Sequence, residues 1–258
     1  MGKGIFLAIP IGNMTPTQIE QLKFALSEPR SSQWPLQPVL PGNWQDLTGE
    51  LALNTVIAVS DWLEETQDVR CLGIEWSVDR VRSRPLLCYE DAVLVEMGGH
   101  AGFGRSGLIN VIVHDDGMTV LNGTSARIHE LNDELPPLLG ETENRLEYLN
   151  LFMNWVHADN GRFQPIGSRE DLERRLRPGS ALPDSEIPVS GFSERHPPEN
   201  SDVIAHFAGT VLYGNALFRA VMAVRPQGFV EMVEDEELLT DLPVREERLV
   251  GPMLVCQN

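Results

Sequence analysis

The sequence predicts an α+β protein, in which mixed or antiparallel sheets combine with about four helices in the first two-thirds of the chain and an antiparallel β-meander ends it. Apolar residues recur at helical spacing in several segments before residue 177. In other segments they alternate with polar residues, as half-buried strands require. After residue 201, short apolar runs are separated by turn residues. The composition, 42% hydrophobic and 22% charged over 258 residues, is typical of a globular protein with a substantial core.

The first elements expected are a strand and two helices. The N-terminal apolar run is short, contains Pro10 and lacks a following A-x-A-like site, so it indicates a strand and not a signal peptide. Thr15-Pro16-Thr17-Gln18 forms a capping box with proline at the first helical position, which predicts a helix over 16–27. After a proline-rich connection at 29–41, the apolar spacing within 46–65 predicts a second, largely buried helix.

Strands are expected between residues 69 and 123. From Val69, apolar and polar residues alternate, and two short apolar runs follow within 85–97. Asp116-Gly117 lies between β-rich flanks and is the strongest hairpin signal in the chain.

Three helices are expected next. The first covers about 125–138 and the second 142–157, where apolar residues occupy so wide an arc that we expect a central core helix. Asn160-Gly161 ends the second helix, and Ser168 caps a short third helix that continues to about Leu176.

The domain prediction divides the chain at a segment rich in proline and serine. We expect an α+β core domain at 1–176, a linker or long loop at 177–201, and a β-rich segment at 202–258 that packs on the core. The last segment has turns at Gly214-Asn215 and Arg225-Pro226-Gln227-Gly228, and it is too small to be more than marginally stable alone.

Composition excludes several classes of function. The net charge of −18 argues against direct binding to nucleic acid or to an anionic membrane, and no apolar run is long enough for a membrane span. Lys3 and Lys23 are the only lysines among 20 basic residues, which leaves little for a P-loop or a polybasic patch. Three cysteines without a C-x-x-C pair indicate reduced thiols in the cytoplasm, and arginine-rich usage fits a bacterial source. No cofactor or metal is expected.

The segment "GGHAGFGRSG" at 98–107 contains the spacing G-x-G-x-x-G. A dinucleotide-binding loop of that pattern needs a following helix, whose N-terminal amides meet the pyrophosphate. The residues after Gly107 predict a strand, so we interpret the segment as a mobile β-β connection. His100, Arg105 and Ser106 remain candidates for contact with an anionic ligand or a partner, because loops often carry function.

Two other motifs have ordinary structural interpretations. Gly123-Thr124-Ser125-Ala126-Arg127 resembles a nucleophile elbow, but arginine stands where close packing needs glycine, so Thr124 or Ser125 is expected to cap a helix. His129 and Asp133 share the i, i+4 spacing of a zinc site, yet they fall opposite the apolar stripe that includes Leu131, Leu135 and Leu138. We therefore expect His129 and Asp133 to lie on the solvent-exposed face of this helix.

No catalytic site is predicted, although a dispersed one stays open. Ser106 or Ser125 with His114 and Asp159 can form a triad only if the fold gathers them, since geometry and not sequence order defines a triad. The pairs Asp115-Asp116 and Asp159-Asn160 are expected to be turns, because both stand beside glycine.

Acidic residues concentrate near the C-terminus, and a solvated face is the usual explanation of such a run. The alternative is a docking surface for a basic protein partner. The residues assigned to this surface are Glu231, Glu234, Asp235, Glu236 and Glu237.

The leading hypothesis is therefore a non-enzymatic binding or assembly subunit of a bacterial cytosolic complex, whose partner is a protein, and a basic one where the acidic residues form the docking surface. A hydrolase with dispersed Ser, His and Asp residues near 98–107 and 123–125 is one alternative. An acidic immunity-type inhibitor of a basic nuclease or toxin is the other, and it predicts tight, salt-sensitive binding. The sequence does not decide whether the protein is an enzyme. The absence of a complete catalytic signature favours a protein without enzymatic activity.

Overall fold

The computed structural model describes residues 38–65, 76–101, 105–183, 186–196 and 202–256. The expected N-terminal strand, the helix at 16–27, the first residues of the strand from Val69 and Cys71 lie outside the described residues. Four α-helices and one 3-10 turn are described: α2 (Gly49–Glu65), α3 (Ser125–Glu134), α4 (Thr142–Trp155), α5 (Arg169–Arg175) and η2 (Pro226–Gly228). The helices expected within 46–65, after Thr124, from residue 142 and after Ser168 are thus confirmed.

The strands form two main sheets and a small hairpin, and the strand pairs are antiparallel, so the predicted α+β fold class is confirmed. The first sheet has the order β1-β2-β3-β4-β14-β13, with β5 paired to β4. Its strands are β1 (Gln45–Leu47), β2 (Trp76–Pro85), β3 (Val93–Ala101), β4 (Ser106–His114), β5 (Gly117–Val120), β13 (Glu247–Val250) and β14 (Met253–Cys256).

The second sheet has the order β12-β11-β10-β8, with β9 also paired to β10. The hairpin of β6 and β7 stands apart from both sheets. The strands are β6 (His157–Ala158), β7 (Gly161–Arg162), β8 (Gln164–Ile166), β9 (Ser193–Arg195), β10 (Ala205–Tyr213), β11 (Ala216–Val224) and β12 (Val230–Leu239).

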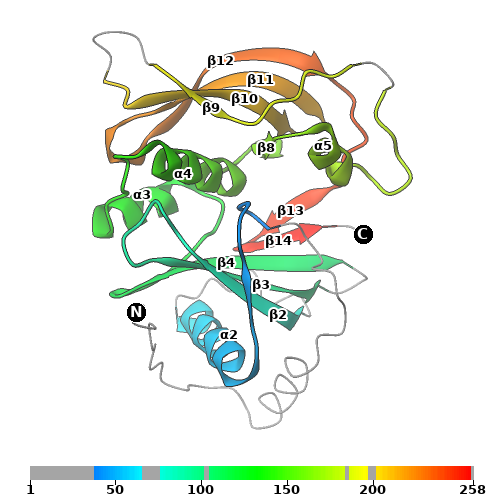
Figure 1. The fold of residues 1–258 in the computed structure, drawn as a ribbon. Coiled ribbons are helices and arrows are strands. Elements are labelled where there is room, and N and C mark those ends of the chain that lie inside the picture. The colour runs from blue at the N-terminus through cyan, green and yellow to red at the C-terminus, as the bar shows by residue number, and fades with distance from the viewer. Residues whose placement is uncertain (1–37, 66–75, 102–104, 184–185, 197–201, 257–258) are drawn as a thin grey trace.

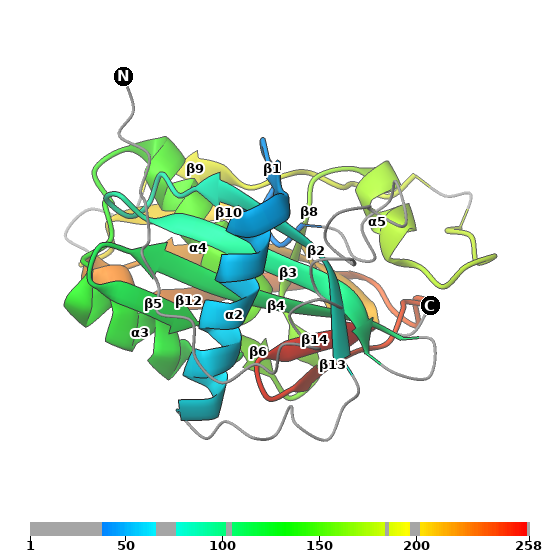
Figure 2. The same cartoon turned by 90° about the horizontal axis from the view of Figure 1, so that it is seen from below.

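Helices and sheets alternate in layers, as Figure 1 shows. Helix α2 covers one face of the first sheet, where apolar residues from β2, β3, β4 and β14 pack against Val56, Ile57 and other residues of the helix. Figure 2 shows α2 lying across these strands. The opposite face of the first sheet packs against α3 and α4. No helix among the described residues is long and apolar enough to cross a membrane.

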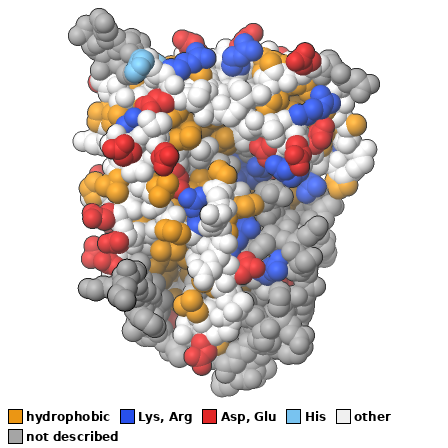
Figure 3. All heavy atoms as spheres, viewed as in Figure 1, with side chains coloured by type: hydrophobic (Ala, Val, Ile, Leu, Met, Phe, Trp, Pro, Cys, Tyr) orange, Lys and Arg blue, Asp and Glu red, His pale blue; other side chains and the backbone are white. Residues whose placement is uncertain are grey.

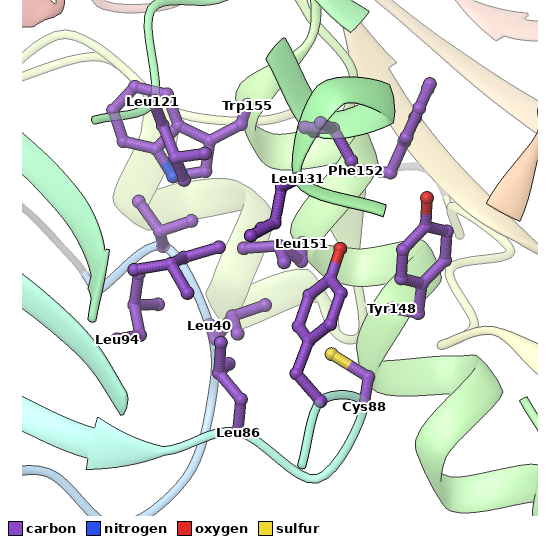
Figure 4. Packing of buried hydrophobic residues seen from close by; sticks show 14 of the residues in the cluster. Leu40, Leu86, Cys88, Leu94, Leu121, Leu131, Tyr148, Leu151, Phe152 and Trp155 are labelled. Carbon is purple, nitrogen blue, oxygen red and sulfur yellow. The ribbon is translucent and has the colours of Figure 1, made fainter. Parts of the chain in front are cut away.

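Helix α4 lies between the two sheets, as the wide arc of its apolar residues predicts. Leu151 and Trp155 belong to the cluster on the first sheet, where Figure 4 shows them among Leu94 and Leu121. Leu149 and Met153, on the opposite side of the same helix, pack against β10 and β11 of the second sheet. A helix that contacts apolar surfaces on two sides needs apolar residues on both, which explains why its amphipathic pattern is weak.

The C-terminal meander is confirmed, and its strands divide between the two sheets. β10, β11 and β12 follow one another with turns at the predicted positions 214–215 and 225–228, the second of which contains η2. β13 and β14 then cross to the first sheet, where β14 pairs with β4. Leu254 and Cys256 are buried on the face that packs against α4.

Some element boundaries differ from the predictions for local reasons. Helix α3 ends at Glu134 and not near residue 138, because Pro136 and Pro137 cannot continue it. Leu138, predicted on the buried stripe, is 42% exposed. The hairpin after β4 is confirmed, but its two turn residues are Asp115 and Asp116, and Gly117 already pairs with His114.

The described part of 177–201 packs against the protein and includes β9. Leu182 is buried in a cluster with Leu172 of α5, Leu212 of β10 and Leu217 of β11. Ser190 donates its amide to the hydroxyl of Thr210 at 2.9 Å. The segment therefore covers one end of the second sheet.

Candidate functional site

The glycine-rich segment joins two adjacent strands. Gly98 and Gly99 belong to β3 and Gly107 to β4, and the backbone of His100 pairs with that of Ser106. The expected β-β connection is therefore confirmed, and no helix follows Gly107 to receive a phosphate. Residues 102–104 lie outside the described part of the chain.

The structure separates Ser106 from His114. Both are buried, and they stand at opposite ends of the nine-residue strand β4, about 26 Å apart at the usual rise per residue. Arg105 is half-buried just before the strand. This arrangement offers Ser106 no route to His114 as a general base.

Ser125 and Asp159 have structural positions of their own. Ser125 is the first residue of α3, and the preceding Thr124 is its N-cap, accepting a hydrogen bond from the amide of Arg127. The capping interpretation of this motif is confirmed. Asp159 is exposed in the two-residue turn between β6 and β7, as predicted from its neighbouring glycine.

The predicted solvated face of α3 is wrong for His129 and correct for Asp133. The His129 ring lies 4.6 Å from the ring of Phe229 and 5.9 Å from that of Phe152, centroid to centroid, and it is half-buried. Asp133 is exposed. The loop before β12 covers this side of the helix, which a helical wheel alone cannot reveal. Among the described residues, no group of three or more His, Cys, Asp or Glu side chains can hold a metal ion.

The five acidic residues assigned to a docking surface all lie on β12, and all are exposed. We call Glu231, Glu234, Asp235, Glu236 and Glu237 the acidic strand. β12 pairs with β11 on one side and ends the order of its sheet, so its other edge is unpaired among the described residues. Figure 3 shows charged side chains along the upper rim, the level at which Figure 1 shows β12.

Two members of the acidic strand form surface ion pairs. Arg219 of β11 donates to Glu236 at 2.5 Å, and Arg225 donates to Glu231 at 2.8 Å. The side chains are between 31% and 62% exposed, so water screens both pairs. Glu234, Asp235 and Glu237 add three negative charges to the same strand.

A charged pair that the sequence did not reveal is buried on the inner face of the first sheet. Arg82 of β2 donates from Nε to Glu96 of β3 at 2.6 Å, and Glu96 also accepts the amide of Val39 at 2.8 Å. Glu96 is fully buried, and burial raises its pKa despite the positive charge of Arg82. The ring of Trp44 covers the guanidinium, with 4.8 Å from its carbon to the ring centroid.

A second buried group of charges lies where β7, α5 and β13 meet. Arg162 donates from Nε and Nη2 to the two carboxylate oxygens of Glu247, at 2.8 and 2.9 Å. This bidentate pair joins residues 85 positions apart in the chain. Glu247 is one of the acidic residues near the C-terminus for which a solvated face is the usual explanation, and for this residue that explanation is wrong, because its side chain is only 17% exposed.

Arg175 and His157 lie beside this pair. Burial lowers the pKa of Arg175, and the positive charge of Arg162 lowers it further. Burial also lowers the pKa of His157, and the positive charge of Arg162 lowers it further. The negative charge of Glu247 acts in the opposite direction and raises the pKa of both residues. The buried Nε of Arg175 and Nε2 of His157 have no hydrogen-bond partner among the described residues.

Sequence signals for these buried charges exist in part. Arg80, Arg82 and Arg84 alternate along β2 at the strand period, which places arginines on one face of the sheet. Glu96 interrupts the apolar run of β3, where a lone carboxylate needs a partner. No local signal links Arg162 to Glu247.

Comparisons with models of protein families, with curated proteins and with solved structures give no match to this chain.

Proposed function

We propose that the protein is a non-enzymatic binding subunit that engages a basic protein partner through the acidic strand. The observation that carries the proposal is the exposure of β12 from Val233 to Glu237. All five residues are exposed, although their side chains alternate between the two faces of the sheet. Within the described part of the chain, both faces of this stretch are exposed and nothing pairs with its outer edge.

An extended basic segment suits such a strand. The edge of β12 that no described residue pairs with offers amide and carbonyl groups to an added strand, and carboxylates on both faces attract alternating Lys or Arg side chains. The overall charge of −18 strengthens this attraction at long range and raises the association rate. The partner is then held by main-chain hydrogen bonds and selected by charge.

Protection of the edge is the competing explanation of the same residues. Proteins place charged side chains on edge strands to prevent pairing with other copies of the chain. Protection accounts for carboxylates on an edge as well as docking does, but it requires no specific partner. The two explanations differ in whether a basic segment binds there.

An immunity-type inhibitor of a basic nuclease or toxin is a narrower form of the proposal, and a cytoplasmic, bacterial setting belongs to it. The hydrolase alternative finds less support, since Ser106 and His114 stand at opposite ends of β4. Ser125 remains as its nucleophile, at the start of α3.

The test is affinity purification of the tagged protein from its host at low and moderate salt. The variant Glu234→Lys/Asp235→Lys/Glu237→Lys changes the acidic strand. The control variant Glu90→Lys/Asp133→Lys/Glu134→Lys makes the same change of charge at three exposed sites outside β12. A stoichiometric basic partner retained by the control, and lost both with salt and with the β12 variant, supports the proposal.

Hydrogen exchange separates strand addition from general attraction. On binding the partner, or a synthetic alternating Lys-Val peptide, the amides of β12 should exchange more slowly than those of α2. Recovery of the chain alone at low salt, or equal loss of the partner in both variants, counts against the proposal.

A further inference from the structure

The feature that remains unexplained is Arg175, the last residue of α5. Its carbonyl accepts the amide of Arg245 at 2.9 Å, and Leu176 forms an isolated bridge with Val244. The end of the helix is therefore fixed against the segment that leads into β13. Glu247 begins β13 directly after this segment, and Arg162 of β7 bonds its carboxylate. The charges of both residues act on Arg175 at the end of α5.

Positive charge exceeds negative charge in this group. The charges of Arg162 and Arg175 both act on one carboxylate, that of Glu247. Arg245 joins them at the buried thiol of Cys256, where all three positive charges lower the pKa that burial raises. Arg162 occupies both oxygens of Glu247 with its bidentate hydrogen bonds. Arg245 directs its Nε to the carbonyl of Leu176 at 2.9 Å.

The charges of Glu247 and Asp171 act on Arg175, but among the described residues no carboxylate accepts a hydrogen bond from it. Its closest carboxylate is Asp171, at 4.0 Å from Nη2, and Asp171 lies nearer to Arg174, at 3.3 Å. The Arg175 side chain is only 14% exposed, and its Nε has no hydrogen-bond partner among the described residues. A buried guanidinium without a fitting acceptor is costly unless another anion completes its surroundings.

We propose that this group of residues is a binding site for a small oxyanion, a phosphate or a carboxylate, with Arg175 as the recognition residue. The planar guanidinium fork matches the geometry of either anion. The unpartnered Nε2 of His157 lies beside the same charges and supplies a second polar contact. Figure 3 shows basic side chains across the middle of this face, where the surface is recessed between the layers and Figure 1 places α5 above β13.

The site stands out because the rest of the chain repels anions. Its net charge is −18, so an anion reaches this recess only through local attraction. The inference is independent of the docking role of the acidic strand, which lies on another sheet.

The test is thermal unfolding in inorganic phosphate against sodium chloride of equal ionic strength. A ligand that binds only the folded state raises the unfolding midpoint, by about 3–5 °C at roughly ten times its dissociation constant. Acetate in place of phosphate distinguishes a carboxylate from a phosphate ligand. Isothermal titration calorimetry gives the affinity directly.

The decisive variant is Arg175→Gln, and its control is Arg174→Gln on the exposed side of the same helix. We expect Arg175→Gln to weaken anion binding at least tenfold and the control to keep it. Without anion, Arg175→Gln should unfold at the same temperature as the wild type or higher, because an incompletely compensated buried charge has been removed. Arg175→Met, which also removes the charge, is compared with the wild type by the same two measurements, anion binding and the unfolding temperature without anion.

The site is refuted if neither phosphate nor acetate raises the midpoint above the chloride reference. It is also refuted if Arg175→Gln retains the full rise.

Discussion

The acidic strand and the inner face of the first sheet hold carboxylates in opposite ways. On β12, four of the five residues from Val233 to Glu237 are acidic, and all five are exposed. On β3, Glu96 is fully buried and bonds both Arg82 and the amide of Val39. Water screens the first set, so its removal changes stability little, whereas loss of a buried partner leaves a charge without solvation. The same residue type is thus exposed to solvent at the rim and stabilises the fold in the interior.

The largest expected effect comes from Glu96→Leu. We expect the free energy of unfolding to fall by about 3–5 kcal/mol, because Arg82 is left charged and buried without its carboxylate. Urea unfolding followed by circular dichroism measures the loss. The double variant Arg82→Met/Glu96→Leu should recover most of it, and a double variant as unstable as the single one would contradict the pairing argument.

Gly228→Ala tests how firmly the start of β12 is attached to the interior. Gly228 has φ +80°, and an added Cβ would lie 2.3 Å from the hydroxyl of Tyr148. That hydroxyl donates to the carbonyl of Gly228 at 2.8 Å, in a buried network that includes Asn132. We expect a loss of about 2–4 kcal/mol from strain and crowding.

The matched control is Gly140→Ala, since nothing lies within 4 Å of the added Cβ there. Thermal unfolding compares the two variants. Equal stability of both would show that the turn before β12 relaxes without cost.

Glu247→Gln sharpens the comparison through its dependence on pH. Burial raises the pKa of Glu247, but the positive charge of Arg162 and its hydrogen bonds outweigh burial, so the pKa lies below its ordinary value. We expect the variant to lose about 1.5–3 kcal/mol at neutral pH.

A carboxyl whose folded-state pKa is depressed stabilises the protein above its unfolded pKa, about 4.3, and loses that contribution as the pH falls through the folded value. The difference in unfolding free energy between the wild type and Glu247→Gln should therefore shrink below about pH 4. Urea titrations at neutral and acidic pH measure it. A difference independent of pH would contradict an ionised Glu247.

The smallest expected effect on stability is that of Glu234→Lys/Asp235→Lys/Glu237→Lys. Exposed charges contribute little individually, so we expect a change of less than about 1 kcal/mol in unfolding free energy. Chemical unfolding beside the wild type measures it. A large loss would assign these carboxylates to folding and remove the contrast with Glu96.

Local sequence signals predicted the helices and strands well, but they predicted the positions of charged and polar side chains less well. Thr124 and Ser168 cap α3 and α5 through hydrogen bonds that the sequence indicated, because a cap involves residues only three positions apart. His129 shows the limit, since Phe229 covers it from a turn a hundred residues later. The excess of arginine over lysine is a sequence feature that fits such long-range contacts. Guanidinium groups here donate hydrogen bonds to carbonyls of distant segments, as Arg177 does to Val244.

The sequence by itself determined the α+β class, the presence of the described helices, the hairpins that join β4 to β5 and β10 to β11, and the acidity of residues 231–237. Each of these depends on periodicity, capping, turn residues or charge within a short stretch of chain. The hairpin of β6 and β7 was not among them, because His157 was expected in the helix before it and Asn160-Gly161 at the end of that helix. Only the tertiary structure decided that β14 pairs with β4, that Arg162 bonds Glu247 and that Nε of Arg175 has no hydrogen-bond partner among the described residues. These pairings join distant segments, and their free energy depends on which groups are removed from water together, a quantity that no short stretch of sequence contains.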